Sequence, residues 1–221
     1  MEFGEPSKPY HKILGPFKRE MNKDHPHYNK VIPGVWTTPE FEYLQHLDWV
    51  WTEKVDGTNI RVHWDGANVS FAGRTDRAQL PPALLKYLHQ QFDAWKFEEV
   101  FGATPITLYG EGYGGKIQKG INYRNDESFV VFDIKVGSWW LQRFNVEEVA
   151  DQFGVDVVPQ IGLPMSVWDA IEVVKGKATS LVSVTRNDLV IEGMVGTPKV
   201  PLFSRSHDRV IMKIKTEDFK A

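Results

Sequence analysis

Glu53-Lys54-Val55-Asp56-Gly57-Thr58-Asn59 is the most informative stretch of the sequence, since it forms a charged turn between two strand-like runs. Residues 49–52 before it are aromatic or β-branched, and residues 60–64 after it alternate with a period of two. Gly57 allows a sharp turn, while Asp56 and Asn59 supply an acceptor and an amide near Lys54. The sequence therefore predicts a pair of strands with Lys54 at the end of the first.

Lys54 has two interpretations. A lysine at the end of an edge strand can simply keep the sheet soluble. An uncharged lysine amine is also a good nucleophile toward carbonyl and phosphoryl centres, although a free lysine is charged at neutral pH. Neighbouring cations or burial must then favour the uncharged amine.

The composition is that of a soluble globular protein. The 221 residues are 42% hydrophobic and 25% charged, which fits one large or two small domains. The absence of cysteine excludes disulfides and cysteine-based zinc sites, and it agrees with an intracellular, cytoplasmic location. We find neither a membrane-spanning apolar run nor a signal-peptide pattern, so no membrane partner is expected.

The net charge of −3 gives no general attraction to nucleic acid, so RNA or DNA would need a local basic face. Such a face is present near the end of the sequence, where bases outnumber acids from residue 199 onward. The bases are Lys199, Arg205, Arg209, Lys213, Lys215 and Lys220, and the acids are Asp208, Glu217 and Asp218. An ordinary solvated surface is the alternative interpretation.

Along the chain, apolar periodicity and capping residues predict an α+β protein with largely antiparallel sheets, because strict βαβ alternation is missing. Residues 1–35 are expected to form an irregular N-terminal arm. Predicted helices cover 38–46, 81–101, 145–154 and 166–176, the last two capped by Asn145 and Ser166. Predicted strands cover 49–52, 60–64, 69–72, 106–109, 129–134, 189–192 and 210–215.

Several strand ends carry charges that a core strand would avoid, namely those of Glu111, Asp133, Glu192, Lys213 and Lys215. The period of a strand places Lys213 and Lys215 on the same face. That face is either exposed to solvent or part of a site.

The motif Lys54-x-Asp56-Gly57 resembles the first motif of the covalent nucleotidyltransferases, which comprise ATP-dependent DNA ligases, RNA ligases and mRNA capping enzymes. The remaining motifs follow in order as Arg74-Thr75, the Glu111 segment, Phe132-Asp133-Ile134, Glu192-Gly193 and Lys213-x-Lys215. The resemblance extends from about Trp49 to Lys215.

One branch of this superfamily is most similar. Gly110-Glu111 followed by Gly114, then Ile117-Gln118-Lys119 and Tyr123, resembles RNA ligases of the phage nick-sealing and kinetoplastid editing types. Asn59 agrees with that branch, since DNA ligases usually carry arginine there.

The resemblance implies the nucleotidyltransferase fold of DNA/RNA ligase catalytic domains, an ATP-grasp-like α+β fold with largely antiparallel sheets flanked by helices. Residues 36–221 would form the adenylyltransferase (RNA ligase catalytic) domain. The sequence ends soon after Lys215, so we expect no C-terminal OB-fold or helical domain. The arm, the basic tail or an accessory nucleic-acid-binding partner would then hold the nucleic acid.

The resemblance also implies roles for individual residues. Lys54 would be the nucleophile that becomes lysyl-AMP, Lys213 and Lys215 would contact the α-phosphate, and Glu192 would hold Mg²⁺ or Mn²⁺. Nucleotide binding would fall to Glu53, Asp56, Asn59, Arg74, Glu111 and Phe132. Among these, Arg74 and Glu111 would engage the ribose and Phe132 would stack on the adenine. Asp56 and Asn59 would order Lys54, the phosphate or metal-bound water.

These roles predict an ATP-dependent RNA ligase that joins 5′-phosphate and 3′-hydroxyl ends of RNA. A phage-encoded role in RNA repair is an expectation by analogy. The alternatives are an ATP-dependent DNA ligase or a GTP-dependent capping-type nucleotidyltransferase. An alternative of another class is a non-catalytic nucleic-acid-binding or adenylate-sensing module.

Overall fold

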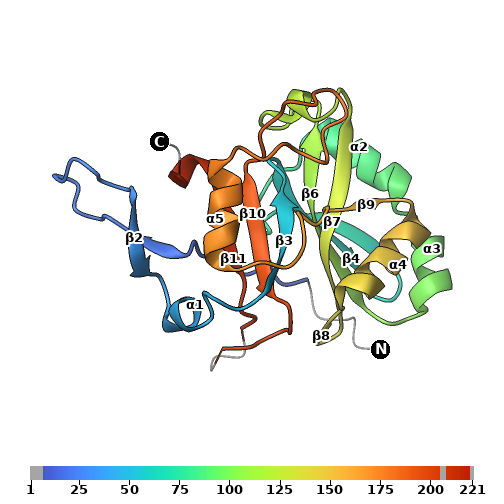
Figure 1. The fold of residues 1–221 in the computed structure, drawn as a ribbon. Coiled ribbons are helices and arrows are strands. Elements are labelled where there is room, and N and C mark those ends of the chain that lie inside the picture. Colours follow the sequence, from blue (N-terminus) through green and yellow to red (C-terminus); the bar gives the residue numbers. More distant parts are fainter. Residues whose placement is uncertain (1–6, 205–207, 220–221) are drawn as a thin grey trace. The chain divides into compact units, whose positions relative to one another are not determined.

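The computed structural model describes residues 7–204 and 208–219 (Figure 1). The chain divides into two compact units. Unit 1 contains residues 7–11, Asp56–Val158 and Val182–Arg186, and unit 2 contains Lys12–Val55, Pro159–Leu181 and the described residues from 187 onward. Arg205 and Lys220 of the predicted basic tail lie outside the described residues.

Unit 1 is built on a six-stranded sheet with the order β5-β4-β6-β7-β8, in which β9 also pairs with β7. The strands are β4 (Thr58–Trp64), β5 (Val69–Ala72), β6 (Ile106–Gly114), β7 (Glu127–Val136), β8 (Trp139–Trp140) and β9 (Asp156–Val157). All pairs are antiparallel except β7 with β9. The residues of β4 alternate, so that Ile60, Val62 and Trp64 face the core.

Three helices cover the apolar face of this sheet (Figure 1). They are α2 (Pro82–Gln91), α3 (Ala94–Phe101) and α4 (Arg143–Phe153), and a short 3₁₀ helix, η1, spans Gly120–Asn122. Leu84 and Leu88 of α2, Phe97 of α3 and Phe153 of α4 are buried in one cluster with the sheet. Burial of such large apolar side chains is the main stabilising term of this unit.

Unit 2 is built on a three-stranded antiparallel sheet with the order β11-β10-β3. These strands are β3 (Trp49–Lys54), β10 (Gly193–Pro198) and β11 (Met212–Lys215). A separate pair joins β1 (Phe17–Arg19) to β2 (Val31–Trp36), and the helices are α1 (Pro39–Tyr43), α5 (Val167–Lys175) and the 3₁₀ helix η2 (Thr216–Phe219).

The core of unit 2 lies between α5 and one face of the three-stranded sheet (Figure 1). Trp49, Trp51 and Met194 on that face pack in one cluster with Ile171 and Val174 of α5. The opposite face of β3 carries Val50, Thr52 and Lys54, which are half-buried. The alternation of β3 therefore separates a core face from a face that carries Lys54.

The predicted fold class is confirmed, since antiparallel sheets flanked by helices make up both units. The helix that begins after Ser166 and the end of α4 at Gly154 also agree with the sequence analysis. Ser166 Oγ accepts a hydrogen bond from the Asp169 N–H, and Gly154 adopts the left-handed conformation with φ of 62°. Within the described residues, no helix combines the length and the apolar character needed to cross a membrane.

Four predictions of local structure were wrong. The expected helix over 81–101 is two helices, because Phe92 leaves helical geometry between α2 and α3. A strand was expected at 189–192, but the strand of this region, β10, begins only at Gly193. Gln142 rather than Asn145 is the N-cap of α4. Within residues 7–35, the described part of the expected irregular arm, β1 and most of β2 form a pair of strands.

Candidate active site

Lys54 and Lys215 lie in one row across the sheet of unit 2. Gly193 on the central strand β10 is the register partner of Lys54 on β3 and of Lys215 on β11. Register partners in an antiparallel sheet project from the same face. The next row contains Thr52, Val195 and Lys213, so all three lysines belong to the half-buried face opposite the core.

Gly193 is required by the close approach of two strands. A Cβ atom at this position would lie 2.1 Å from the carbonyl oxygen of Ile214 and 2.9 Å from Cα of Lys215. Real Cβ atoms do not approach backbone so closely, and a larger residue would push β10 and β11 apart. Gly193 therefore allows β10 and β11 to lie close together, so that Lys215 stays near Lys54 across the sheet.

Glu192 joins the two lysines through its two carboxylate oxygens. Its Oε2 lies 2.5 Å from Lys54 Nζ, and its Oε1 lies 3.8 Å from Lys215 Nζ. About a quarter of each of these side chains is exposed. The immediate partner of the Lys54 amine is therefore a carboxylate.

Lys215 also donates a hydrogen bond to Glu217 Oε1, at 3.0 Å. This hydrogen bond is the main cause that raises the pKa of Lys215 above its ordinary value, and partial burial opposes it. Lys215 therefore carries its positive charge throughout the physiological pH range, as a group that neutralises phosphate must.

Glu53 lies on the core face of β3 and is almost completely buried. Its Oε1 accepts a hydrogen bond from Ser180 Oγ at 2.5 Å, and its Oε2 accepts one from the Leu181 N–H at 2.8 Å. A buried carboxylate needs such donors. These contacts tie β3 to the segment that follows α5, and the predicted nucleotide-binding role of Glu53 stays a prediction.

The predicted ribose and adenine residues belong to unit 1. Asn59 on β4 is the register partner of Glu111 on β6, so their side chains share the face opposite the helices. Asn59 Oδ1 is buried and has no hydrogen-bond partner among the described residues. Gly57 keeps the turn close to β6, because a Cβ there would lie 2.3 Å from the Gly112 carbonyl oxygen.

Phe132 occupies a β-bulge in β7. Tyr109 pairs with Asp133 and Gly110 pairs with Val131, which leaves Phe132 without a partner in the ladder. A bulge adds one residue and redirects its side chain. The half-buried ring of Phe132 lies 5.0 Å from the ring of Tyr10, centroid to centroid, in an edge-to-face arrangement.

The segment 7–11 lies against the same polar face of unit 1. Tyr10 donates a hydrogen bond to Asp133 Oδ2 at 2.8 Å, and Tyr109 donates one to the Lys8 carbonyl oxygen at 2.9 Å. Sequence analysis missed Tyr10, because an aromatic residue in a segment without periodicity gives no signal of what it contacts. The only sequence signal was Asp133, because an acidic residue within an apolar strand indicates that a polar group must contact it.

Two other predicted nucleotide-binding residues, Arg74 and Asp56, lie in loops of unit 1. Arg74 lies exposed in the loop after β5. Asp56 is half-buried, and its backbone N–H donates to Tyr123 Oη at 3.2 Å.

A divalent cation would have to be held in part by substrate. Within residues 7–204 and 208–219, no three His, Cys, Asp or Glu side chains form a metal-ligating group. Magnesium commonly binds one or two carboxylates together with substrate phosphates and water. Glu192, a single half-buried carboxylate between two lysines, fits that pattern.

Solved structures with a similar fold come from an RNA ligase of Naegleria gruberi. A variant with AMP and Mn has a TM-score of 0.63 and 17% identity, covering 82% of this chain and 53% of that one. A variant with ATP and Mn has the same TM-score and 16% identity, with the same coverage of each chain. The ligase with PPi has a TM-score of 0.61 and 18% identity, again covering 82% and 53%.

The chain thus spans about half the length of the solved structures it matches. No curated protein matches its sequence. The sequence model of the family described as RNA ligase matches residues 47–215, which is well over half of the chain and includes the row of Lys54, Gly193 and Lys215. The chain belongs to the RNA ligase family.

Proposed function

We propose that the chain is an enzyme, an ATP-dependent RNA ligase that works through a lysyl-AMP intermediate. The row that places Lys54 and Lys215 on either side of Gly193, bridged by Glu192, is the observation that carries the proposal. It brings a nucleophile, a fixed positive charge and a carboxylate onto one face of one sheet. These are the groups that phosphoryl transfer uses.

In the first step, Lys54 Nζ attacks the α-phosphorus of ATP. The new N–P bond replaces the bond from the α-phosphorus to the leaving oxygen of pyrophosphate, and the amine loses its proton. Lys213 and Lys215 neutralise the charge that builds on the α-phosphate. Glu192 would hold the Mg²⁺ or Mn²⁺ ion, which supplies charge neutralisation for the triphosphate when bound.

The ion pair between Lys54 and Glu192 has a consequence for this step. While the pair is intact, the Lys54 amine is in contact with the Glu192 carboxylate and is not directed at a phosphorus atom. Glu192 must exchange Lys54 for another cation before the amine is released. Nucleophile activation and ATP binding are thereby coupled through one carboxylate.

In the later steps, a 5′-phosphate oxygen of RNA attacks the AMP phosphorus and the N–P bond to Lys54 breaks. A 3′-hydroxyl then attacks the activated 5′-phosphate, AMP leaves and a phosphodiester forms. Arg74 and Glu111 would bind the ribose, Phe132 the adenine, and Glu53, Asp56 and Asn59 would order the nucleotide and its surroundings. The unsatisfied buried Oδ1 of Asn59 supports a role in ligand contact.

The motifs of residues 110–123 support the phage nick-sealing and kinetoplastid editing type within the family, with residues 36–221 as the adenylyltransferase domain. The substrate would be RNA with 5′-phosphate and 3′-hydroxyl ends, and an accessory nucleic-acid-binding partner would assist. A cytoplasmic setting agrees with the use of ATP and the lack of cysteine.

Intact mass spectrometry after incubation with ATP and Mg²⁺ tests the proposal. We expect a gain of one AMP in the wild type, no gain in Lys54→Ala, and an unchanged gain in Lys23→Ala, whose lysine is an exposed residue of unit 2. A Lys54→Ala protein that still acquires AMP would contradict the proposal.

The same assay with GTP, together with nick-sealing and RNA-binding assays, separates the alternatives. A gain of GMP with GTP would indicate capping-type chemistry, and sealing of DNA nicks in preference to RNA nicks would indicate a DNA ligase. RNA binding without any adduct would indicate a non-catalytic module.

A further inference from the structure

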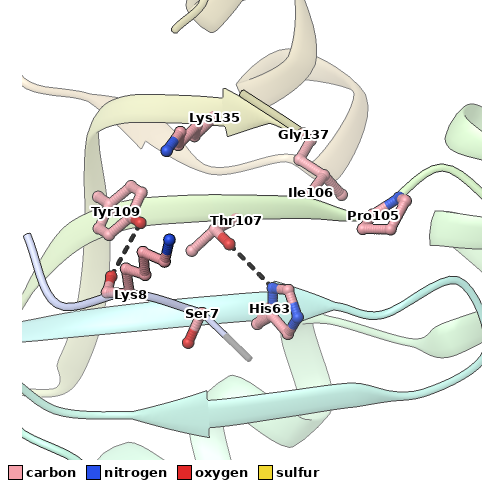
Figure 2. Close-up of a pocket in the computed structure, with 9 residues that line it drawn as sticks. All are labelled: Ser7, Lys8, His63, Pro105, Ile106, Thr107, Tyr109, Lys135 and Gly137. Atoms are coloured by element: carbon pink, nitrogen blue, oxygen red, sulfur yellow. Dashed lines mark hydrogen bonds between the residues drawn. The ribbon is translucent and has the colours of Figure 1, made fainter. Parts of the chain in front are cut away.

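A pocket on the polar face of the unit 1 sheet takes no part in the chemistry described above. Its cavity volume is about 290 Å³. Ser7, Lys8, His63, Thr107, Tyr109 and Lys135 are among the residues that line it. Figure 2 shows these side chains coming from three neighbouring strands and from the segment that contains Ser7 and Lys8. We call it the His63 pocket.

The sheet itself builds the floor of the His63 pocket. His63 on β4 is the register partner of Thr107 on β6, and Thr107 is the register partner of Lys135 on β7. This row is two residues along β4 from the row of Arg61, Tyr109 and Asp133. Three hydrogen-bonded strands therefore hold the polar groups in place, which is the condition for a preorganised binding site.

His63 presents a buried nitrogen that lacks a partner. Only 8% of the residue is exposed, and its Nδ1 lies 2.8 Å from Thr107 Oγ1 (Figure 2). Its Nε2 is buried and has no hydrogen-bond partner among the described residues. A buried polar atom without a partner costs free energy, so one in a native protein calls for an explanation. In the tautomer in which Nδ1 accepts a hydrogen bond from the Thr107 hydroxyl, Nε2 carries a hydrogen and is a donor.

The charge of the pocket selects the kind of ligand. Lys8 and Lys135 both line it, and none of the nine described residues around it is acidic. The Lys135 ammonium lies 5.4 Å from the centroid of the Trp140 ring, a cation–π contact that restrains its position. Two ammonium groups, a ring N–H and the Ser7 hydroxyl are donors that suit an anion with several oxygens.

We propose that the His63 pocket binds a phosphate group of an RNA strand. Lys8 and Lys135 contribute charge, and His63 Nε2 and the Ser7 hydroxyl donate hydrogen bonds to phosphate oxygens. The choice of RNA as the source of the phosphate rests on the proposed ligase function. The pocket would give the RNA strand a second point of contact with the sheet. The proposed nucleotide-binding residues Asn59 and Glu111 lie two rows away from it on β4 and β6.

The first experiment follows the imidazole signals of His63 by ¹H–¹⁵N NMR, assigned with His63→Gln. Inorganic phosphate is expected to shift these signals, and a short 5′-phosphorylated RNA is expected to displace it. The same RNA with a 5′-hydroxyl distinguishes a terminal phosphate from the backbone. No response to phosphate or to either RNA overturns the proposal, and a response to phosphate alone overturns the assignment to RNA.

The second experiment measures RNA affinity as a function of salt for Lys135→Gln, Lys135→Arg and Lys86→Gln. Lys86 is an exposed lysine on α2, a helix that packs against the opposite face of the sheet, and serves as the matched control. We expect Lys135→Gln to weaken binding at least about threefold and to reduce the salt slope by about one, while Lys135→Arg retains affinity. Equal behaviour of Lys135→Gln and Lys86→Gln overturns the proposal.

The two proposals can fail separately. AMP transfer to Lys54 should be unchanged in Lys135→Gln, because Lys135 takes no part in that step. A wild-type protein whose His63 responds to RNA but which forms no AMP adduct would contradict the ligase function and leave the phosphate pocket standing.

Discussion

Lys54 and Glu192 form an ion pair with 2.5 Å between Nζ and Oε2, at the end of two adjacent strands. The pair holds the proposed nucleophile and the proposed metal ligand against each other. About a quarter of each side chain is exposed, so desolvation of the two charges offsets much of their attraction and the pair adds little to the free energy of unfolding. We expect the pair to affect the proposed AMP transfer more than the free energy of unfolding.

Glu192→Gln should separate these two effects. The change removes the charge that a divalent cation needs, so AMP transfer to Lys54 should fall about 100-fold. The melting temperature should stay close to that of the wild type. Rates of adduct formation and thermal denaturation measure both, with Glu172→Gln on the exposed part of α5 as the control. An active Glu192→Gln enzyme would remove this residue from the mechanism.

Gly193→Ala should disrupt the lysine row. The added Cβ would meet the Ile214 carbonyl oxygen at 2.1 Å, so β10 and β11 must separate. We expect a loss of about 2 kcal/mol in the free energy of unfolding and impaired AMP transfer. Gly15→Ala is the matched control in unit 2, since its Cβ would have an ordinary contact of 3.7 Å. Equal stability of the two variants in urea would show that the strands can adjust.

Phe132→Ala should weaken ATP binding about tenfold, the loss expected when one aromatic stacking partner of a base is removed. Phe132→Trp should retain affinity because it keeps a flat ring. Equilibrium binding of ATP in the Lys54→Ala background isolates this effect from covalent transfer. Phe144→Ala, on an exposed part of α4, is the control. Unchanged affinity in Phe132→Ala would exclude adenine stacking on this ring.

The free energy of unfolding should decrease as the pH falls below 6.5. Burial lowers the pKa of His63 from the ordinary value of 6.5, so the unfolded chain takes up the proton more readily than the folded chain. A hydrogen bond with the Ile106 backbone and the charge of Asp65 oppose this lowering of the pKa, and the charge of Arg61 adds to it. The stabilisation is present above pH 6.5 and is lost as the pH falls toward the lower pKa of the folded state.

Urea titrations of the wild type and His63→Gln across this pH range test the expectation. In His63→Gln, the free energy of unfolding should depend less on pH than in the wild type. His46→Gln, which changes an exposed histidine, should keep the wild-type pH dependence. Parallel slopes for all three proteins would contradict the burial argument.

Local sequence patterns predicted β3, β4, β5 and α5, where alternation, caps and turn residues all agree with the final structure. They failed at β10, whose residues Gly193 and Gly196 are typical of a turn. Tertiary contacts explain the failure, because these glycines admit the Ile214 carbonyl and the Trp51 ring. A pattern within one strand cannot show what approaches it from the next.

For the candidate site, too, sequence patterns predicted the residues but not their arrangement. The order of the motifs identified Lys54, Glu192, Lys213 and Lys215 as candidates, but neither the shared row nor the ion pair can be read from spacing, since both depend on register between distant strands. His63 was assigned only to a strand. Its unsatisfied nitrogen becomes visible once β4 is paired with β6.

The unpaired position of Phe132 makes this residue dispensable for the architecture of β7. Without it, Val131 would still face the helices and Asp133 would still face the opposite side, in an uninterrupted ladder with Gly110 and Tyr109. We therefore expect deletion of Phe132 to preserve the β6–β7 ladder while removing the ring that packs against Tyr10. The β6–β7 ladder does not require this additional residue, which agrees with the proposed role of its ring in contacting the adenine.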